Sequence, residues 1–384
     1  MPKSLFRRLT KHAAIITNFI VVLLFVIGCY SEYFFSEGLW PIGLLSLALF
    51  YLLIVLIGFF FFWLMAKPRW TILFIVTIAI TQSHIRQIIP LRFSASFTMK
   101  KADNHLRVMS WNAAQFDILH AKKQPEKQQE MVDQIKSFDP DIACIQEMVA
   151  GDSIVNTHTP YYKRFAFIPL DSFAKRLGYS EYFYSYNYKE NFLDQQHFGI
   201  IIFSKYPIIN RQAISYYPHD YNSRFQYVDI VKNNDTFRVF NVHLQSLRFS
   251  ILNREYIDNP SIQSEKDIAK SKSILNKFRV GFQRRKTQAD RIRIEMEKSP
   301  YPVIVCGDFN DVPNSYPYET IGRGMKNAFA EKGAGLGRTF SGISPTLRID
   351  HIFVDEHFTV EQFKRVPKDL SDHFAIITDL SKAK

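Results

Sequence analysis

Residues 303–311 are VIVCGDFND, an apolar run followed by a glycine and then three polar side chains in four positions. Four consecutive apolar residues, three of them β-branched, predict a buried strand. Asp308 and Asn310 follow directly, so carboxylate and amide oxygens stand where this strand ends. Taken alone, the stretch is equally well explained as a turn built from Asp and Asn, so its meaning depends on the rest of the chain.

The same bias toward polar strand ends recurs at five other places. The motifs are RVMSWN (107–112) with Asn112, PDIACIQE (140–147) with Glu147, FNVHLQS (240–246) with Asn241 and His243, RIDHIF (348–353) with Asp350 and His351, and SDHFAI (371–376) with Asp372 and His373. Each residue alone has an ordinary explanation as a cap, an ion-pair partner or a core histidine, and we interpret His351 as packing. Six such ends together predict a shared rim where loops converge, the usual place for a site on a sheet scaffold.

Strands dominate the chain after residue 100, with helices between them. Strands are predicted at 106–112, 141–147, 162–168, 198–203, 208–216, 226–232, 236–243, 302–306, 348–354 and 374–379, and helices begin at Pro125 and span 265–298. This order suits two packed sheets flanked by helices, an α+β fold of the α/β-sandwich type. Three cysteines without CxxC spacing predict neither a disulfide framework nor a zinc site.

The N-terminal part contains long apolar runs. Residues 13–30 and 39–66 carry no charge, and each is long enough to cross a hydrocarbon core of ~30 Å. A third run at about 70–89 is marginal because it contains His84 and Arg86. A cleavable signal peptide does not fit, because a second apolar run follows the first directly. We therefore expect two to three transmembrane helices in a membrane anchor over residues 1–100.

Charge predicts the orientation of this anchor. Bases precede the first run and lie between the second and third, whereas the first loop holds two acids and no base, so the positive-inside rule places the N-terminus in the cytoplasm. Three spans, which we favour although further bases follow the last run, put residues 101–384 outside; two would put them inside. The expected location is integral to a plasma membrane, of the bacterial inner-membrane type, with an extracytoplasmic catalytic domain.

Net charge gives little support for a nucleic-acid partner. Most of the formal +12 belongs to residues 1–100, which hold 9 Lys+Arg and 2 Asp+Glu. In the second domain a basic helical insertion at about 246–300 holds 13 Lys+Arg and 7 Asp+Glu. Such a stretch can dock on anionic lipid, follow a phosphate backbone or form a solvated helix face, and the sequence leaves these three open.

The motif series resembles that of the endonuclease/exonuclease/phosphatase superfamily, also described as the DNase I-like fold. The match includes FGIIIFSKYPI (198–208) and runs in order from about residue 106 to 380. The short motifs mean little singly, but their combination in this order is specific. The resemblance implies a four-layer sandwich with two central mixed β-sheets, here preceded by the predicted transmembrane helices.

The resemblance also implies a Mg²⁺ or Mn²⁺ site at the rim of the sheets. By position it assigns metal binding to Asn112, Glu147 and Asp372, water activation to Asp308, phosphate contacts to Asn310 and His243, and a charged pair to Asp350 and His373. A hard cation held by oxygen ligands would neutralise an anionic phosphoester so that water can attack it.

The match departs from the subgroups in several places. Met148 and Val149 follow Glu147, where many nucleases of this group carry a basic residue. The tryptophan of the apurinic-site endonucleases and the WCDR pattern of the inositol-phosphate phosphatases are both absent. No carboxylate partner of His243 is identifiable, and Asp229 is only a guess. None of these subgroups is therefore a clear match.

The sequence thus predicts a membrane-anchored, divalent-metal-dependent phosphoesterase that hydrolyses a phosphodiester or phosphomonoester. Its expected partners are the lipid bilayer and a phosphate-ester substrate, whether nucleic acid, phospholipid head group or phosphorylated small molecule. A nuclease acting on DNA or RNA is one alternative. A catalytically inactive membrane-bound binding scaffold is the other, and the complete set of site residues argues against it.

Overall fold

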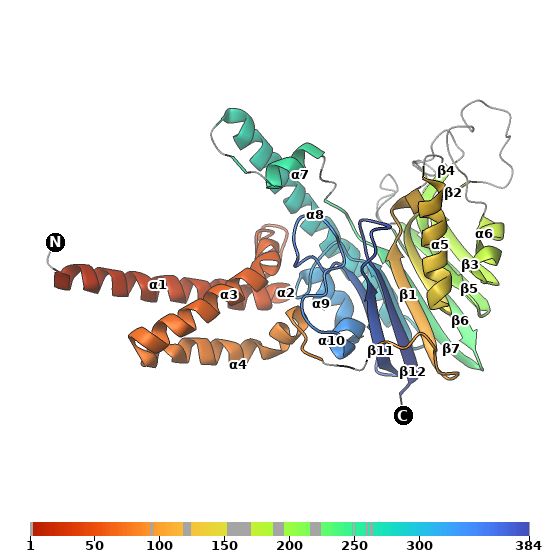
Figure 1. Ribbon diagram of the computed structural model, residues 1–384, viewed down its shortest axis with the longest axis horizontal. Coiled ribbons are helices and arrows are strands. Elements are labelled where there is room, and N and C mark those ends of the chain that lie inside the picture. Colours follow the sequence, from red (N-terminus) through yellow and green to blue (C-terminus); the bar gives the residue numbers. More distant parts are fainter. Residues whose placement is uncertain are drawn as a thin grey trace.

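Three apolar helices extend from one side of a two-sheet sandwich in the computed structural model (Figure 1). The structure describes residues 3–92, 94, 96–117, 124–151, 170–186, 196–215, 224–247, 249, 251–258, 260–261 and 264–383. The predicted strand at 162–168 lies outside these residues.

The first sheet is mixed and has six strands in the order β11-β12-β1-β2-β4-β3. Its strands are β1 (Leu106–Asn112), β2 (Ile142–Gly151), β3 (Glu181–Tyr186), β4 (Gln196–Ser204), β11 (Phe358–Val366) and β12 (Ala375–Lys382). Strands β1 and β2 are parallel, and the other neighbours are antiparallel. The first and last described strands of the sandwich therefore lie side by side in its middle.

The second sheet is also mixed, in the order β5-β6-β7-β8-β10-β9. Its strands are β5 (Ile208–Ser215), β6 (Arg224–Lys232), β7 (Asp235–His243), β8 (Val303–Asp308), β9 (Lys326–Asn327) and β10 (Asp350–Val354). Strands β7 and β8 are parallel, and the others pair antiparallel. The parallel pair β7–β8 requires a long crossover, which the chain makes through residues 244–302.

Helices cover the outer faces of both sheets. The described helices that follow β1 in the chain are η2 (Ala114–Asp117), α5 (Pro125–Phe138), α6 (Leu170–Leu177), α7 (Ile251–Asp258), α8 (Glu265–Glu297), α9 (Tyr316–Gly322) and α10 (Ala328–Lys332). Successive side chains of a strand face opposite ways, so Val108 packs between the sheets while Met109 and Trp111 face α5 and α6. On the other side, Val305 of β8 packs against Ile292 of α8. The predicted four-layer α+β sandwich is confirmed.

The sequence missed the less regular elements. Strand β3, the two-residue strand β9 and strand β11 were not predicted, and the stretch 141–147 continues as β2 to Gly151. The three cysteines are buried and unpaired as expected: Cys144 and Cys306 lie between the sheets, and Cys29 lies among the apolar helices.

The apolar segment forms α1 (Lys3–Cys29), the short α2 (Ser31–Phe34), α3 (Ile42–Ala66), η1 (Pro68–Trp70) and α4 (Thr71–Ile88). Within it, Arg8–Cys29, Ile42–Ala66 and Pro68–Ile88 are each long and apolar enough to cross a membrane, judged by length and composition. The three helices pack on one another, and Trp63 Nε1 donates to Asn18 Oδ1 across 3.1 Å. All three predicted apolar runs are therefore helical.

Buried hydrogen bonds join these helices to the loop that follows β8. Asn314 is fully buried, its Oδ1 lies 3.1 Å from His84 Nδ1, and its Nδ2 donates to the His84 carbonyl at 3.1 Å. The hydroxyl of Ser31 donates to the Asn314 carbonyl at 2.7 Å, and that of Ser46 donates to the same oxygen at 3.3 Å. Helices α2, α3 and α4 thus converge on one residue of the sandwich.

A buried arginine makes a second connection to α4. Arg348 is 2% exposed and donates to the carbonyls of Gln87, Ile88 and Leu336, the first two at the C-terminal end of α4. The last carbonyls of a helix have no partner inside it and carry partial negative charge, so a guanidinium satisfies both needs there. The polar contacts of Asn314 and Arg348 fix the sandwich against the helices.

Replacing Asn314 with Gly is expected to lower the stability of the full-length protein by about 1–3 kcal/mol, because His84 and its carbonyl would lose their buried partner. Asn314 has φ +64°, a conformation glycine adopts without strain, so the substitution tests the side chain alone. Asn233→Gly is the matched control, at φ +50° in an exposed turn. Thermal unfolding in detergent measures both; equal unfolding temperatures for the two variants would contradict the account.

Candidate functional site

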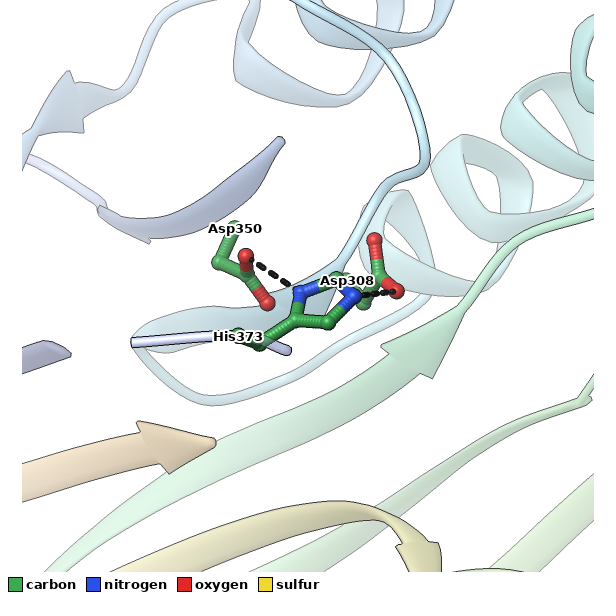
Figure 2. Close-up of side chains that lie close together, drawn as sticks. All are labelled: Asp308, Asp350 and His373. Carbon is green, nitrogen blue, oxygen red and sulfur yellow. Dashed lines mark hydrogen bonds and ion pairs between the residues drawn. The ribbon is translucent and has the colours of Figure 1, made fainter. Parts of the chain in front are cut away.

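The predicted rim residues come from both sheets and meet at one end of the sandwich. Three neighbouring strands of the second sheet place His243, Asp308 and Asp350 in line, because His243 is the register partner of Asp308 and Asp308 that of Asp350. The first sheet contributes Asn112 at the end of β1 and His373 just before β12. Figure 2 shows His373 between Asp350 and Asp308.

Asp308 lies at the centre of this group. Its side chain is 1% exposed, and its two oxygens accept hydrogen bonds from the Asn310 backbone N–H at 2.8 Å, from Asn310 Nδ2 at 3.2 Å and from Asn112 Nδ2 at 3.1 Å. Its Oδ2 also lies 3.5 Å from His243 Nε2 and 3.7 Å from His373 Nε2. A buried carboxylate with this many donors and cations is held in one orientation.

His373 is held by a second carboxylate on its far side. Its Nδ1 lies 2.9 Å from Asp350 Oδ2, and both side chains are buried (Figure 2). Burial alone would lower the pKa of His373, but the charges of Asp350 and Asp308 outweigh burial and raise this pKa to about 10. The imidazole is therefore a cation at neutral pH.

Glu147 reaches the site through an irregularity in β2. The register with β4 shifts between Ile145 and Met148, and Glu147 adopts φ +52° at this bulge. A bulge re-aims a side chain relative to a regular strand. Glu147 Oε1 lies 3.9 Å from His243 Nε2, and its side chain is 23% exposed. The sequence predicted Glu147 at a strand end, and the structure corrects this to a bulge inside a longer strand.

The pKa of Glu147 reflects burial first and nearby negative charge second. Burial raises this pKa most, the charges of Asp372 and Asp308 raise it further, and His373 and the Asn112 amide oppose them, for a net value of about 7. The pKa of the buried Asp308 is raised as well, by burial first and by Asp350, against the two histidines. For Glu147 and Asp308, the neighbouring groups therefore do not fully offset the cost of burying a negative charge.

The site opens into a cleft of about 410 Å³. Predicted site residues on its lining are Asn112, Glu147, His243, Asp308, Asn310, Asp372 and His373. Asp350 is not on the lining and lies behind His373, whereas Asp372 is exposed at the rim. The structure therefore brings all eight predicted residues to one place.

Two sequence interpretations have clear outcomes. His351 is 1% exposed and contacts the rings of Phe309 and Tyr318, so its interpretation as packing is confirmed. The guess that Asp229 partners His243 is wrong. Asp229 pairs at 2.6 Å with Arg238, which lies five positions before His243 on β7. Within the part of the chain that the structure describes, the carboxylates of Asp308 and Glu147 lie 3.5 and 3.9 Å from His243 Nε2.

Two further residues position the site, and the sequence analysis assigned a role to neither. Ser371 Oγ donates to the Asn112 carbonyl at 2.8 Å and accepts from the His373 backbone N–H at 3.2 Å. Thr339 Oγ1 accepts the backbone N–H groups of Ile349 and Asp350 at 2.9 and 3.0 Å. Ser371 is the first residue of the SDH motif, which could have indicated it, whereas Thr339 lies in a loop without a recognisable pattern.

A family model described as the endonuclease/exonuclease/phosphatase family matches residues 109–373, more than half of the chain and all eight site residues. The chain belongs to this family. Members of the endonuclease/exonuclease/phosphatase family are hydrolases that act on phosphoester bonds. A second family model, described only as a domain of unknown function, matches residues 11–88. No curated protein matches the chain.

Several solved structures are similar to this chain, and the first one named here supports the fold. An endonuclease/exonuclease/phosphatase from Beutenbergia cavernae is 18% identical with a TM-score of 0.50, over 73% of this chain and 72% of its own. The human Nocturnin catalytic domain with bound sulfate anion is 17% identical with a TM-score of 0.48, over 74% and 97%. A family protein from Bacteroides thetaiotaomicron is 16% identical with a TM-score of 0.48, over 73% and 98%.

The donor set fits a divalent cation of the kind this family uses. Among the described residues, Asp308, Asp350 and His373 offer ligand atoms within 4.8 Å of one another. A protonated His373 cannot coordinate a metal, so the candidates for holding the cation are the oxygen ligands on the cleft lining, from Glu147, Asp372 and the Asn112 amide. Carboxylate and amide oxygens suit hard cations such as Mg²⁺ or Mn²⁺.

Cation binding is expected to weaken as the pH falls below about 7, because Glu147 must lose its proton before it can bind a metal. The apparent dissociation constant for Mn²⁺ should rise roughly tenfold per pH unit below that pKa and level off above it. The rise in unfolding temperature with added Mn²⁺ measures this affinity. Glu147→Gln should bind weakly without pH dependence, and a wild-type affinity equal at about pH 6 and 8 would contradict the assignment.

Proposed function

We propose that the protein is a membrane-anchored, divalent-metal-dependent phosphoesterase. One observation carries the proposal: Asp308 lies between two histidine rings, 3.5 Å from His243 and 3.7 Å from His373, with Glu147 at the same end of one cleft. Family membership supplies the reaction class, hydrolysis of a phosphoester bond. The proposal assigns each side chain a part in that reaction.

Glu147, Asn112 and Asp372 would hold Mg²⁺ or Mn²⁺ at the rim. The cation, when bound, withdraws negative charge from the phosphoryl oxygens and thereby makes phosphorus open to attack. Glu147 is the main ligand in this assignment, because burial and the neighbouring charges of Asp372 and Asp308 raise its pKa, and a bound cation would offset both. Asp372 is exposed and contributes from the open side of the cleft.

Asp308 would act as the base that orients the attacking water. The water oxygen attacks phosphorus, the bond from phosphorus to the leaving oxygen breaks, and the water proton passes to Asp308. The leaving oxygen then takes up one proton from Asp308 or solvent and departs as an alcohol. Burial raises the pKa of Asp308, which makes it a stronger base than an ordinary carboxylate.

The two histidines would stabilise the charge that develops on the phosphoryl oxygens. His373 is held positive by Asp350, and His243 faces the same Asp308 oxygen. Asn310 is a different case, because its Nδ2 already donates to Leu244 O at 3.0 Å and to Asp308 Oδ2. We therefore assign Asn310 first to positioning Asp308, and a phosphate contact requires exchange of one of these bonds.

We also propose that residues 1–100 anchor the catalytic domain, residues 101–384, in a plasma membrane of the bacterial inner-membrane type. Large apolar side chains are exposed along all three helices, and such a surface is stable only when lipid covers it. At the end of the helices far from the sandwich, Lys11 lies near the charges of Lys67 and Arg69. The positive-inside rule then places the sandwich on the extracytoplasmic side.

The basic stretch 246–300 divides into two parts within this scheme. The C-terminal half of α8 packs on the second sheet through Ala289, Ile292 and Met296, so it belongs to the outer helical layer. The N-terminal part of α8 projects with α7 beyond the sandwich (Figure 1). We restrict the proposed insertion to this projecting part.

Glu147→Gln, Asp308→Asn and His373→Ala are each expected to lower kcat/KM by about 100-fold or more, because each removes a charge or base needed in the transition state. The measurement is hydrolysis of a chromogenic phosphodiester and phosphomonoester by full-length protein in detergent with Mg²⁺ or Mn²⁺. Activity that survives all three substitutions and excess EDTA would remove the proposal.

Matched controls keep the same chemical changes away from the cleft. Glu356→Gln, Asp235→Asn and His357→Ala alter exposed side chains, and the last two are 60% and 61% exposed. These variants should keep wild-type activity. An equal loss in the controls would show that the assay reports stability and not the site.

A further inference from the structure

The cleft continues beyond the polar end into an apolar half. Leu247, Phe249 and Phe278 line one side of it, and Ile343 and Leu347 lie on the loop before β10. Phe249 and Phe278 are in edge contact at 5.6 Å. A water-soluble phosphoester has no apolar group that could pack on such a surface. An apolar group attached to the phosphate would be removed from water there.

One wall of this apolar half comes from the segment proposed to span the membrane. Leu47 and Tyr51, one turn apart on α3, line the same cleft as Glu147, Asp308 and His373. The hydroxyl of Tyr51 lies 3.0 Å from Ser344 Oγ, so the helix contacts the loop that carries Ile343. Helix α3 is thus part of the wall of the catalytic cleft and not a remote tether.

The same helix also presents a surface for lipid. Next to Tyr51 in sequence, Ile54, Val55 and Ile57 are 51%, 43% and 40% exposed, and Tyr51 itself is 47% exposed. Because Tyr51 also lines the cleft, the exposed apolar surface of α3 adjoins the cleft. An apolar chain that lies against this surface is therefore next to the cleft.

The charges on the lining indicate a substrate with few phosphates. Among the described lining residues, Arg285 is the one Lys or Arg, and its guanidinium is buried against Asp311 at 2.9 Å. A groove for nucleic acid carries several cations that follow the phosphate backbone, with aromatic rings on which bases stack. In the cleft, the described aromatic residues are accompanied by aliphatic residues, and the described lining has no such row of cations.

We propose that the substrate is a membrane lipid with a single phosphate ester, which enters from the bilayer beside α3. The ester lies at Glu147, Asp308 and His373, and the apolar part lies against Leu47, Tyr51 and the facing wall. This inference rests on the proposed phosphoesterase function and names its substrate class. The chemistry is the hydrolysis already described, with a lipid alcohol or a head-group alcohol as the leaving group.

The test uses full-length protein in mixed micelles with Mn²⁺ and two head groups. The probes are phosphatidylglycerol, a phosphodiester, and phosphatidic acid, a phosphomonoester, each with long hexadecanoyl chains or short butanoyl chains. Tyr51→Ala and Ile343→Ser should lower kcat/KM for the long-chain probe about tenfold more than for its short-chain counterpart, because each removes an apolar contact made only by the long chains. The two head groups distinguish a diesterase from a monoesterase.

Matched controls remove apolar side chains of similar exposure elsewhere. Val76→Ala changes an exposed residue of α4, 51% exposed against 47% for Tyr51, and Ile294→Ser changes an exposed residue of α8, 45% exposed against 43% for Ile343. Both should keep wild-type activity on long and short chains alike. Ile343 lies on an exposed loop, so Ile343→Ser still tests the apolar wall of the cleft if Tyr51→Ala unfolds the protein. The unfolding temperature of each variant shows whether it is folded.

The outcomes separate the substrate class from the function. Cation-dependent hydrolysis that Glu147→Gln abolishes, with the same long-to-short ratio in every variant, would overturn the lipid inference and leave the phosphoesterase proposal standing. Faster hydrolysis of a single-stranded oligonucleotide than of any long-chain lipid would do the same. If none of the phosphoesters is hydrolysed in a way that requires Glu147, both the lipid inference and the phosphoesterase proposal would be overturned.

Discussion

The site depends on one buried carboxylate, Asp308, whose charge is held by groups from both sheets. Asn310 comes from its own loop, Asn112 from the first sheet, and His243 and His373 lie on either side. A buried charge is costly unless several donors and cations surround it. Each of these elements must therefore take its place before the Asp308 carboxylate can be charged in the interior. The packing of the two sheets and the arrangement of the site residues therefore depend on the same contacts.

The helices at the N-terminus take part in that arrangement. The loop that follows Asp308 at the end of β8 contains Asn314, which hydrogen-bonds to His84 of α4 and to serines of α2 and α3. Arg348, two residues before Asp350, binds the C-terminal carbonyls of α4. The chain segments next to Asp308 and Asp350 are thus both anchored on the apolar helices, which also supply Leu47 and Tyr51 to the cleft.

Sequence patterns predicted the regular parts well and the irregular parts poorly. Runs such as VIVC before Asp308 are short, apolar and β-branched, and the strands they predict are present. The bulge at Glu147 was not predictable, because it depends on the pairing of β2 with β4. Resemblance located all eight site residues, although their roles stay predictions. The contributions of Thr339, Leu47 and Tyr51 arise only from tertiary packing, so no local pattern signals them.

The contacts of Asn314 and Arg348 with the helices also mean that a disturbance can pass from one part of the molecule to the other. Arg348 binds the last carbonyls of α4 and stands two residues before Asp350, the first residue of β10. A displacement of α4 would therefore pull on the backbone next to Asp350, and through Asp350 on the His373 ring. The arrangement of side chains at the cleft is in this way sensitive to how the three apolar helices pack.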